Sequence, residues 1–221
     1  MYFPYSDGPG LVESLRDRGG WDAVDDAYDE RPDGAREVIT PADYPDWERT
    51  DVSVTDRSTD DWERVRPSTN SDRPDYATVG PSAIAAALAY TAADDYNDSG
   101  VVGPRDIFNY RDGSLDSSDP YNYDLPATSG YEGDRMYVYA DGSASAYVWK
   151  TVWANETAAR TFADSWTAVI EHWGGTETAD GNWVVAEDSP YTDAIAVRVE
   201  GDTVTVVNAP TEAELQEVSD A

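Results

Sequence analysis

The most regular alternation of hydrophobic and polar positions lies in residues 130–175, and it predicts one compact folding unit. Residues 136–140 and 147–153 alternate with a period of two, with large side chains on both faces, as in a strand packed on two sides. An Asp-Gly pair between them favours a hairpin turn. Asn155 is a good N-cap for the amphipathic helix that follows, and two glycines end that helix.

The residues after this unit predict three more strands and a closing helix. We expect the strands over residues 183–186, 194–199 and 204–208. A Gly-Asp pair joins the last two strands in a hairpin, and Thr211 with Glu214 fits a capping box for the final helix. The order β-β-α-β-β-β-α indicates an α+β fold class, with a mainly antiparallel sheet packed with helices.

The N-terminal part of the chain predicts short helices separated by turns. Leu11, Val12 and Leu15 share one helical face, and two glycines stop that helix before a second begins near Asp22. Prolines punctuate the residues that follow. We therefore expect residues 1–46 to form a helical N-terminal unit.

A polar segment separates this unit from the rest. Residues 47–75 are rich in Ser, Thr, Asp and Pro, which favours a linker with one edge strand at 52–55. The α+β domain then takes residues 76–221.

This domain is expected to begin with a helix and a long connection. Pro81 suits a first helical position, and the alanine-rich residues after it have high helix propensity. Residues 97–129 form a polar connection in which Ile107 and Phe108 are the expected anchors.

The charge balance narrows the classes of partner. Acidic residues number 45 and basic residues 15, which gives a net charge of −30. Such a chain repels nucleic acid and anionic membranes, so we expect no nucleic-acid partner. Lys150 is the only lysine. An acidic chain that uses arginine in place of lysine suggests a protein built for high salt, where self-repulsion is screened within about 3 Å at 1 M.

The sequence shows no cysteine, no candidate membrane span and no visible signal peptide. It has no cysteine, which excludes disulfides and thiolate chemistry. No apolar run approaches the roughly 18 residues of a membrane span, so we expect no membrane insertion. The first residues read as structured sequence without a signal peptide, which favours a cytoplasmic chain unless it is part of a longer exported protein.

Candidate catalytic residues are few. His172 is the only histidine and lies near the C-terminal end of a predicted helix, where the helix dipole favours a cation. No strained serine turn accompanies it, so we interpret it as a surface or half-buried helix-end residue. A single histidine also cannot provide an HExxH zinc site. We therefore expect no catalytic, cofactor-binding or metal-binding residue, with one alternative.

That alternative is a calcium loop after the predicted helix that Pro81 opens. The spacing follows positions 1, 3, 5, 6, 8 and 12 of such a loop. These positions hold Asp95, Asn97, Ser99, Gly100, Val102 and Asp106. The last position has Asp where a bidentate Glu is usual, and partial matches arise by chance in so acidic a chain. A polar loop is the favoured interpretation.

Two parts of the chain resemble a known family. Residues 2–46 contain FPYSDGPGLV, RGGWDAVDDAYDERP and VITPADY, and residues 128–175 contain GYEGDR, VWKTVW and AARTFADSW. They resemble zincin-like metallopeptidases of bacteria and of halophilic archaeal surface proteins. In that family the first part follows the HExxH helix, and the second belongs to a downstream non-catalytic domain.

The departures from the family pattern concern its catalytic residues. The HExxH helix is absent and would lie before Met1. Thr40 and Arg36 stand where the family has a histidine and a glutamate. The resemblance therefore extends to scaffold positions alone. They are Pro4, Tyr5, Gly8, Gly20, Trp21, Gly133, Asp134 and Arg135.

The resemblance implies a non-catalytic scaffold or interaction domain of a halophilic cell-surface protein, truncated relative to its family. Trp21 and the face of Leu11–Leu15 would then be left exposed and available to a protein partner or to self-association. The alternatives are a fragment of a zinc metallopeptidase whose HExxH lies upstream, and a calcium-binding surface module. Localisation is the cell surface by resemblance, and the cytoplasm if the chain as written is complete.

Overall fold

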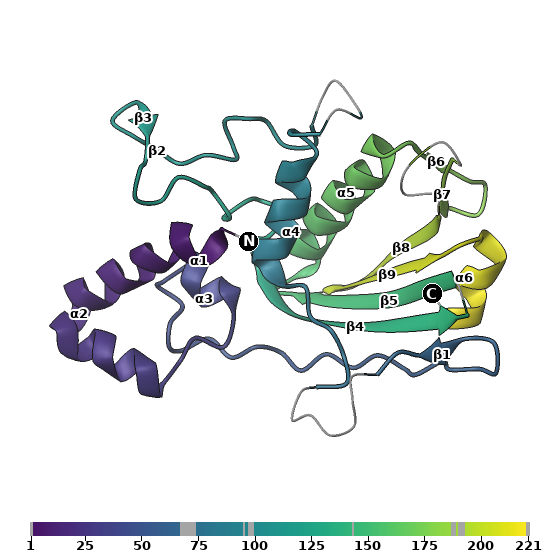
Figure 1. Ribbon diagram of the computed structural model, residues 1–221, viewed down its shortest axis with the longest axis horizontal. Helices are drawn as coiled ribbons and strands as arrows, with labels where there is room; N and C mark the ends of the chain where they lie inside the picture. Colours follow the sequence, from purple (N-terminus) through teal and green to yellow (C-terminus); the bar gives the residue numbers. More distant parts are fainter. Residues whose placement is uncertain are drawn as a thin grey trace.

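The computed structural model describes residues 2–66, 74–94, 96, 100–142, 144–186, 189 and 193–219. Within these residues the fold is a seven-stranded antiparallel sheet with helices on both faces and a helical N-terminal unit at one side (Figure 1). The strand order is β1-β4-β5-β9-β8-β7-β6. This confirms the predicted α+β fold class.

The elements have the following bounds. The sheet strands are β1 (Glu63–Arg64), β4 (Tyr131–Asp141), β5 (Ala144–Trp153), β6 (Gly175–Glu177), β7 (Trp183–Val185), β8 (Ala194–Glu200) and β9 (Thr203–Ala209). A separate hairpin comprises β2 (Tyr110–Arg111) and β3 (Ser114–Leu115). The helices are α1 (Phe3–Ser6), α2 (Gly8–Asp29), α3 (Ala35–Ile39), α4 (Gly80–Tyr90), α5 (Glu156–His172) and α6 (Glu212–Val218).

One face of the sheet packs against α4 and α5 through an aromatic core. Trp149 and Trp153 of β5 both contact Phe162 of α5, with ring centroids 5.4 and 4.8 Å apart. Ile84 and Leu88 of α4 join this cluster, and all five side chains are buried. Large aromatic side chains bury much area, so this layer supplies much of the hydrophobic stabilisation.

The opposite face packs against α6 and the segment that leads into β1. Tyr139 and Val148 are buried there with Trp62, whose indole N–H donates to Glu217 Oε2 at 3.0 Å. Leu215 and Val218 of α6 complete the cluster. The second face of the alternating strands is thus buried as well, which agrees with the two-sided pattern.

Both predicted hairpins are confirmed. In β4–β5, Asp141 lies opposite Ala144, and Gly142 has a positive φ of 51°. In β8–β9, Glu200 lies opposite Thr203. The short strand β6 was not predicted, because its Gly-Thr-Glu sequence has no alternation of apolar residues.

The two predicted helix caps differ in outcome. Asn155 caps α5 as expected, with its side chain accepting from the amide of Ala158 at 3.0 Å. Helix α6 begins after Thr211, but the expected reciprocal bonds of a capping box are not formed. Instead the Thr211 hydroxyl donates to Glu214 Oε2 at 2.5 Å, so the two side chains bond each other.

The N-terminal unit contains the predicted helix break. Gly20 has φ 72° and ψ −160°, which interrupts α2 and turns the chain into a second helical segment. Leu11 and Leu15 are buried against Tyr44, so the expectation that they are exposed is wrong, whereas Val12 of the same predicted face is 39% exposed. Trp21 is 64% exposed.

The segment expected to be a linker lies against the edge of the sheet over residues 50–66. The amides of Thr50 and Val65 donate to carbonyls of β4 at 2.9 and 2.8 Å. The strand that pairs with β4 at this edge is β1, so the prediction of an edge strand at 52–55 is wrong. Residues 67–73 lie outside the described part of the chain.

The buried residues that anchor the long connection after α4 lie further along the sequence than predicted. Ile107 and Phe108 are half-buried, whereas Leu125 and Ala127 are buried in the main core. The Thr128 hydroxyl donates to the carbonyl of Leu125 at 2.9 Å and fixes the turn before β4. The anchor therefore lies next to the strand that the connection leads into.

Candidate functional site

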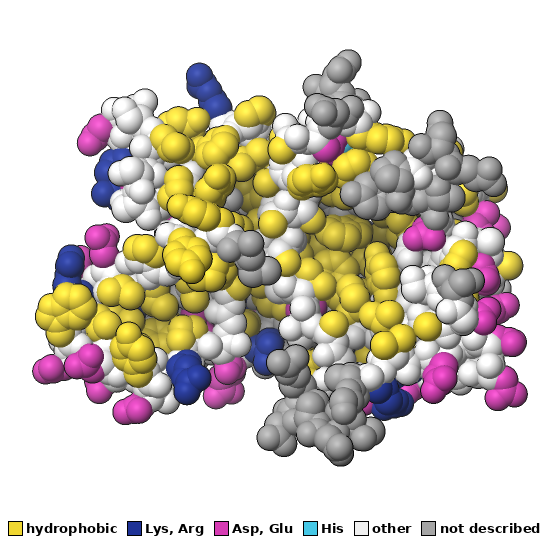
Figure 2. Space-filling model, in the orientation of Figure 1, with side chains coloured by type: hydrophobic (Ala, Val, Ile, Leu, Met, Phe, Trp, Pro, Cys, Tyr) yellow, Lys and Arg dark blue, Asp and Glu magenta, His cyan; other side chains and the backbone are white. Residues whose placement is uncertain are grey.

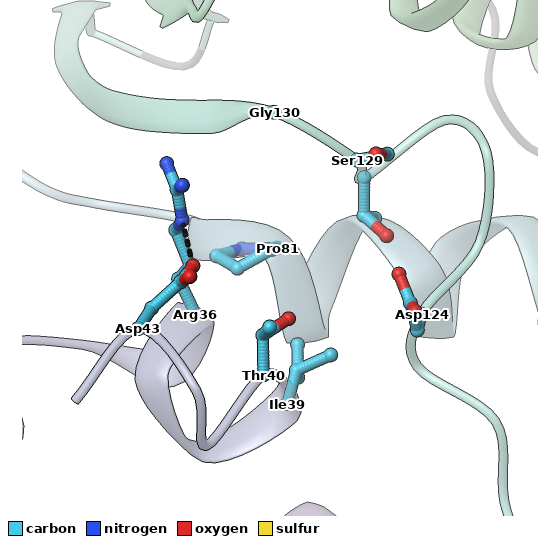
Figure 3. Close-up of a pocket in the computed structure, with 9 residues that line it drawn as sticks. Arg36, Ile39, Thr40, Asp43, Pro81, Asp124, Ser129 and Gly130 are labelled. Carbon is cyan, nitrogen blue, oxygen red and sulfur yellow. Dashed lines mark hydrogen bonds and ion pairs between the residues drawn. The ribbon is translucent and has the colours of Figure 1, made fainter. Parts of the chain in front are cut away.

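A polar pocket of about 230 Å³ lies where the N-terminal unit meets the rest of the fold. In Figure 3, Arg36 and Asp43 occupy one side, Asp124 and Ser129 the other, and Thr40 and Pro81 lie between them. These residues come from α3 and the turn after it, from the start of α4, and from the connection before β4. The pocket is therefore built from segments far apart in sequence.

Arg36 connects the N-terminal unit to β4. Its Nε donates to Asp43 Oδ2 at 2.8 Å, and its Nη1 donates to Glu132 Oε1 and to the carbonyl of Tyr131, both at 2.7 Å. Trp47 adds an indole N–H bond to Glu132 Oε2 at 3.0 Å. Burial acts to lower the pKa of the Arg36 guanidinium, but hydrogen bonds to the Glu132 and Asp43 carboxylates raise this pKa above its ordinary value. Arg36 therefore acts as a structural ion-pair centre.

The same pocket contains the position that the metallopeptidase resemblance relates to a histidine. Thr40 lies in its wall, and Arg36, which stands where the family has a glutamate, is the ion-pair centre. Neither side chain has the chemistry of a zinc ligand or general base. The other polar side chains that line the pocket are Asp43, which is paired with Arg36, the buried Thr128, and the exposed Ser129 and Asp124.

His172 is buried, so the prediction of a surface or half-buried residue is wrong. Its Nε2 lies 3.0 Å from Asp94 Oδ2, and the two side chains are 3% and 6% exposed. The ring also contacts Trp173 at 5.0 Å between centroids. The sequence could not reveal this pairing, because Asp94 is one of 45 acidic residues. A carboxylate against a buried imidazole satisfies its polar nitrogen, and the surrounding aromatic rings favour this structural role.

The calcium alternative falls mostly outside the described residues. Asp95, Asn97 and Ser99 are not described, while Asp106 is exposed and its amide donates to the carbonyl of Gly103 at 2.9 Å. Within the described ranges, no group of three or more acidic or histidine side chains is placed to hold a metal ion. Calcium binding stays an untested alternative to the polar loop that the sequence favours. The described helices also include none that is long and apolar enough to cross a bilayer.

The Gly133-Asp134-Arg135 motif has a structural role at each position. A Cβ on Gly133 would lie 2.4 Å from the carbonyl oxygen of Thr50, so only glycine admits the 50–52 segment there. Arg135 donates to Asp51 Oδ1 at 2.5 Å, and its guanidinium lies 4.0 Å from the centre of the Tyr76 ring. Both flanking residues of the motif thus fasten the preceding segment to β4.

Asp134 itself is a buried acceptor for four donors. Its Oδ2 accepts from the amide of Val79 at 2.7 Å and from the indole of Trp149 at 2.9 Å. Its Oδ1 accepts from the amide of Gly80 at 3.2 Å and from the hydroxyl of Tyr131. The amides of the residues that open α4 are therefore capped from β4. Burial, and then the charge of Asp134, raise the pKa of Tyr131, which keeps it a donor.

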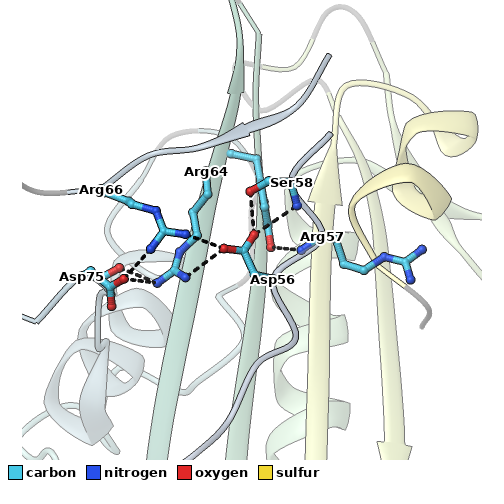
Figure 4. A network of polar contacts seen from close by, with 7 residues as sticks. Asp56, Arg57, Ser58, Arg64, Arg66 and Asp75 are labelled. Carbon is cyan, nitrogen blue, oxygen red and sulfur yellow. Dashed lines mark hydrogen bonds and ion pairs between the residues drawn. The ribbon is translucent and has the colours of Figure 1, made fainter. Parts of the chain in front are cut away.

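A second charged network lies on the edge strand (Figure 4). Arg64 is buried, and its guanidinium lies 3.3 Å from the centre of the Tyr137 ring. It contacts Asp56 at 3.2 Å and Asp75 at 3.1 Å, and Arg66 contacts the same two carboxylates at 2.6 and 2.7 Å. Burial acts to raise the pKa of Asp56, but hydrogen bonds from neighbouring residues hold it below its ordinary value.

Comparison with known proteins identifies one family. The model of a family described as a domain of unknown function (DUF8575) matches residues 63–219. The match begins at β1 and ends one residue after α6, so it covers the sheet and leaves α1–α3 outside. No curated protein and no solved structure matches the chain.

Proposed function

Since the chain belongs to the DUF8575 family, whose function is unknown, we propose that it is a non-catalytic interaction domain of a halophilic cell-surface protein. We further propose that it is a relative of the zincin-like metallopeptidases it resembles, without their chemistry. The polar groups described above support the first part, since the buried Asp134 and Arg64 and the half-buried Arg36 are each engaged in contacts that hold segments together.

The observation that carries the proposal is the set of aromatic side chains exposed on the N-terminal unit. Tyr5, Trp21 and Tyr28 are 73%, 64% and 75% exposed. Trp21 and Tyr28 lie seven residues apart in the second segment of α2, so they share a helical face. Figure 2 shows hydrophobic side chains gathered over α2, with acidic and basic ones around them. Exposed aromatic groups within a charged rim are typical of protein interfaces.

The charge of the chain favours a different protein over a second copy as the partner. Two chains of net charge −30 repel each other, and α2 carries acidic side chains beside its aromatic ones. A partner with an apolar groove and a basic rim would complement this face. In high salt the repulsion is screened, so self-association becomes an outcome to measure.

The experiment compares surface substitutions in a binding assay. The purified chain and its Trp21→Ala and Tyr28→Ala variants are immobilised and exposed to cell-envelope proteins of the source organism in high salt. Tyr110→Ala, which removes a 56% exposed tyrosine of β2 outside this face, is the matched control. We expect a protein that is retained by the parent and the control, and lost with either α2 variant.

Two results would contradict the proposal. Retention of the same proteins by the parent and both α2 variants would remove the role of the aromatic face. Zinc-dependent peptidase activity of the purified chain would show that it is an enzyme. Sedimentation of the parent and the Trp21→Ala variant in high salt measures whether the face binds a second copy instead.

A further inference from the structure

Three basic residues and Thr205 form a row across four strands on the sheet face that carries α6. In the strand register Arg135 of β4 lies opposite Lys150 of β5, Lys150 lies opposite Thr205 of β9, and Thr205 lies opposite Arg198 of β8. Side chains alternate along a strand, so this row shares its face with the buried Val148. The chain has 15 basic residues against 45 acidic ones, which makes three aligned cations notable.

A cavity of about 390 Å³ opens over this row. Lys150, Thr205 and Arg198 line it, and Val148 and Val218 contribute buried apolar surface. Glu200 is the one acidic side chain among its described lining residues. A cavity with an apolar wall and a few convergent polar groups is the usual form of a small-molecule site, and its volume falls within the range of roughly 300–1,000 Å³ for such sites.

Two of the cations have no carboxylate partner among the described residues. Lys150 and Arg198 form no ion pair there within 4.0 Å. Arg198 donates to the carbonyl of Gly181 at 3.0 Å and to Asn182 Oδ1 at 2.5 Å, and these neutral acceptors orient the guanidinium without cancelling its charge. Arg135, by contrast, is paired with Asp51.

Besides Lys150 and Arg198, one further basic residue, Arg57, lines the cavity. Figure 4 shows its side chain extending away from the Asp56 network. Arg57 has further contacts of its own, so Lys150 and Arg198 provide the charge that a ligand would meet.

We propose that this cavity binds a small organic anion, with its carboxylate between Lys150 and Arg198 and its apolar body against Val148 and Val218. The two basic residues lie on strands two spacings apart, about 10 Å, and both side chains line the cavity. An arginine fork matches carboxylate geometry, and lysine adds a mobile point charge. The site lies on the sheet, apart from the aromatic face of α2.

The single lysine permits a direct test. Protein grown with ¹³C-labelled lysine gives side-chain NMR signals from position 150 alone, because the sequence has no other lysine. The probe is phenylacetate, and phenylacetamide is its neutral analogue of nearly the same shape. At constant ionic strength we expect phenylacetate to shift the Lys150 signal saturably, while phenylacetamide leaves it unchanged.

Three variants test how individual charged side chains affect the affinity for phenylacetate. Arg198→Gln should weaken phenylacetate binding at least about threefold, since one charged donor is lost. Arg160→Gln removes an exposed arginine of α5 that pairs with Glu156, and it should leave the affinity unchanged. Glu200→Gln removes the acidic lining residue and should tighten binding. Thermal unfolding of each variant first establishes that it is folded.

The proposal fails if phenylacetate produces no saturable shift, or if phenylacetamide produces the same shift. It also fails if Arg198→Gln and Arg160→Gln have equal effects. Should Arg198→Gln not fold, Glu200→Gln decides the matter, because unchanged or weaker binding in that variant contradicts an anion beside position 200.

Discussion

The carboxylate of Asp134 accepts the indole hydrogen of Trp149 at 2.9 Å while it also caps the start of α4. One side chain of β4 thus connects the aromatic core to the helix that covers it. The two residues belong to neighbouring strands and are 15 positions apart, and Val79, whose amide Asp134 accepts, lies 55 positions before Asp134.

Asp134→Asn is expected to destabilise the protein strongly. Asparagine retains one acceptor oxygen and presents an NH₂ group to donors that need an acceptor, so at least one buried donor loses its partner. The expected loss is about 3 kcal/mol in the free energy of unfolding, measured by denaturant titration. Asp141→Asn, at the exposed end of the same strand, should change it by less than about 0.5 kcal/mol. Equal effects of the two variants would contradict the role of Asp134.

Gly133→Ala is expected to displace the segment that precedes β1. The added methyl group would lie 2.4 Å from the carbonyl of Thr50, so the 50–52 segment must move. We expect a loss of about 1–3 kcal/mol and faster hydrogen exchange at the Thr50 amide, which donates to Glu132. Gly10→Ala is the control, because its new methyl group meets nothing within 4 Å. Unchanged exchange at Thr50 in Gly133→Ala would contradict the expected displacement.

The raised pKa of Asp7 predicts that the stability of the protein depends on pH. Burial, and then the nearby Asp119 carboxylate, raise the pKa of Asp7 from 3.8 to about 7, and its buried Oδ2 has no hydrogen-bond partner. The folded state therefore binds a proton that the unfolded state has released. The resulting stability is present below pH 4 and is lost as the pH rises to about 7.

Asp7→Asn removes this titration. Relative to the parent, the variant should gain about 2–4 kcal/mol between pH 4 and pH 8, measured by denaturant unfolding at both pH values. Asp119→Asn provides a comparison, since it should lower the pKa of Asp7 but leave a residual slope caused by burial. A parent and an Asp7→Asn variant with parallel pH profiles would show that Asp7 titrates normally.

Arg64→Gln is expected to be more disruptive than Arg66→Gln. The Arg64 side chain is 5% exposed and stacks on Tyr137, whereas Arg66 is 49% exposed, although both contact Asp56 and Asp75. We expect about 3 kcal/mol for Arg64→Gln and less than about 1 kcal/mol for Arg66→Gln in denaturant unfolding. A larger loss for Arg66→Gln would indicate that the exposed ion pairs dominate.

The predicted strands and helices were most accurate where a local rule applies. The hairpin at 141–142, the cap at Asn155 and the break at Gly20 each depend on a few neighbouring residues. The prediction was wrong where a residue's environment depends on distant segments. The sequence predicts a surface or half-buried His172, yet it is buried against Asp94, 78 positions away. The pocket around Arg36 was not predicted either, because its walls come from three separate parts of the chain.

The sequence by itself determined the α+β class, the order of the main elements and the strong negative charge, since these follow from residue periodicity and composition. The tertiary structure alone decided which acidic side chains become buried partners and where cations align. Asp94 and Asp56 are not distinguishable from other acidic residues until packing brings donors to them. The resemblance marks Asp134 as a scaffold position, but only packing shows which donors it accepts from. The row of Lys150 and Arg198 likewise exists only through strand register, because pairing across β9 joins residues that have no local relation.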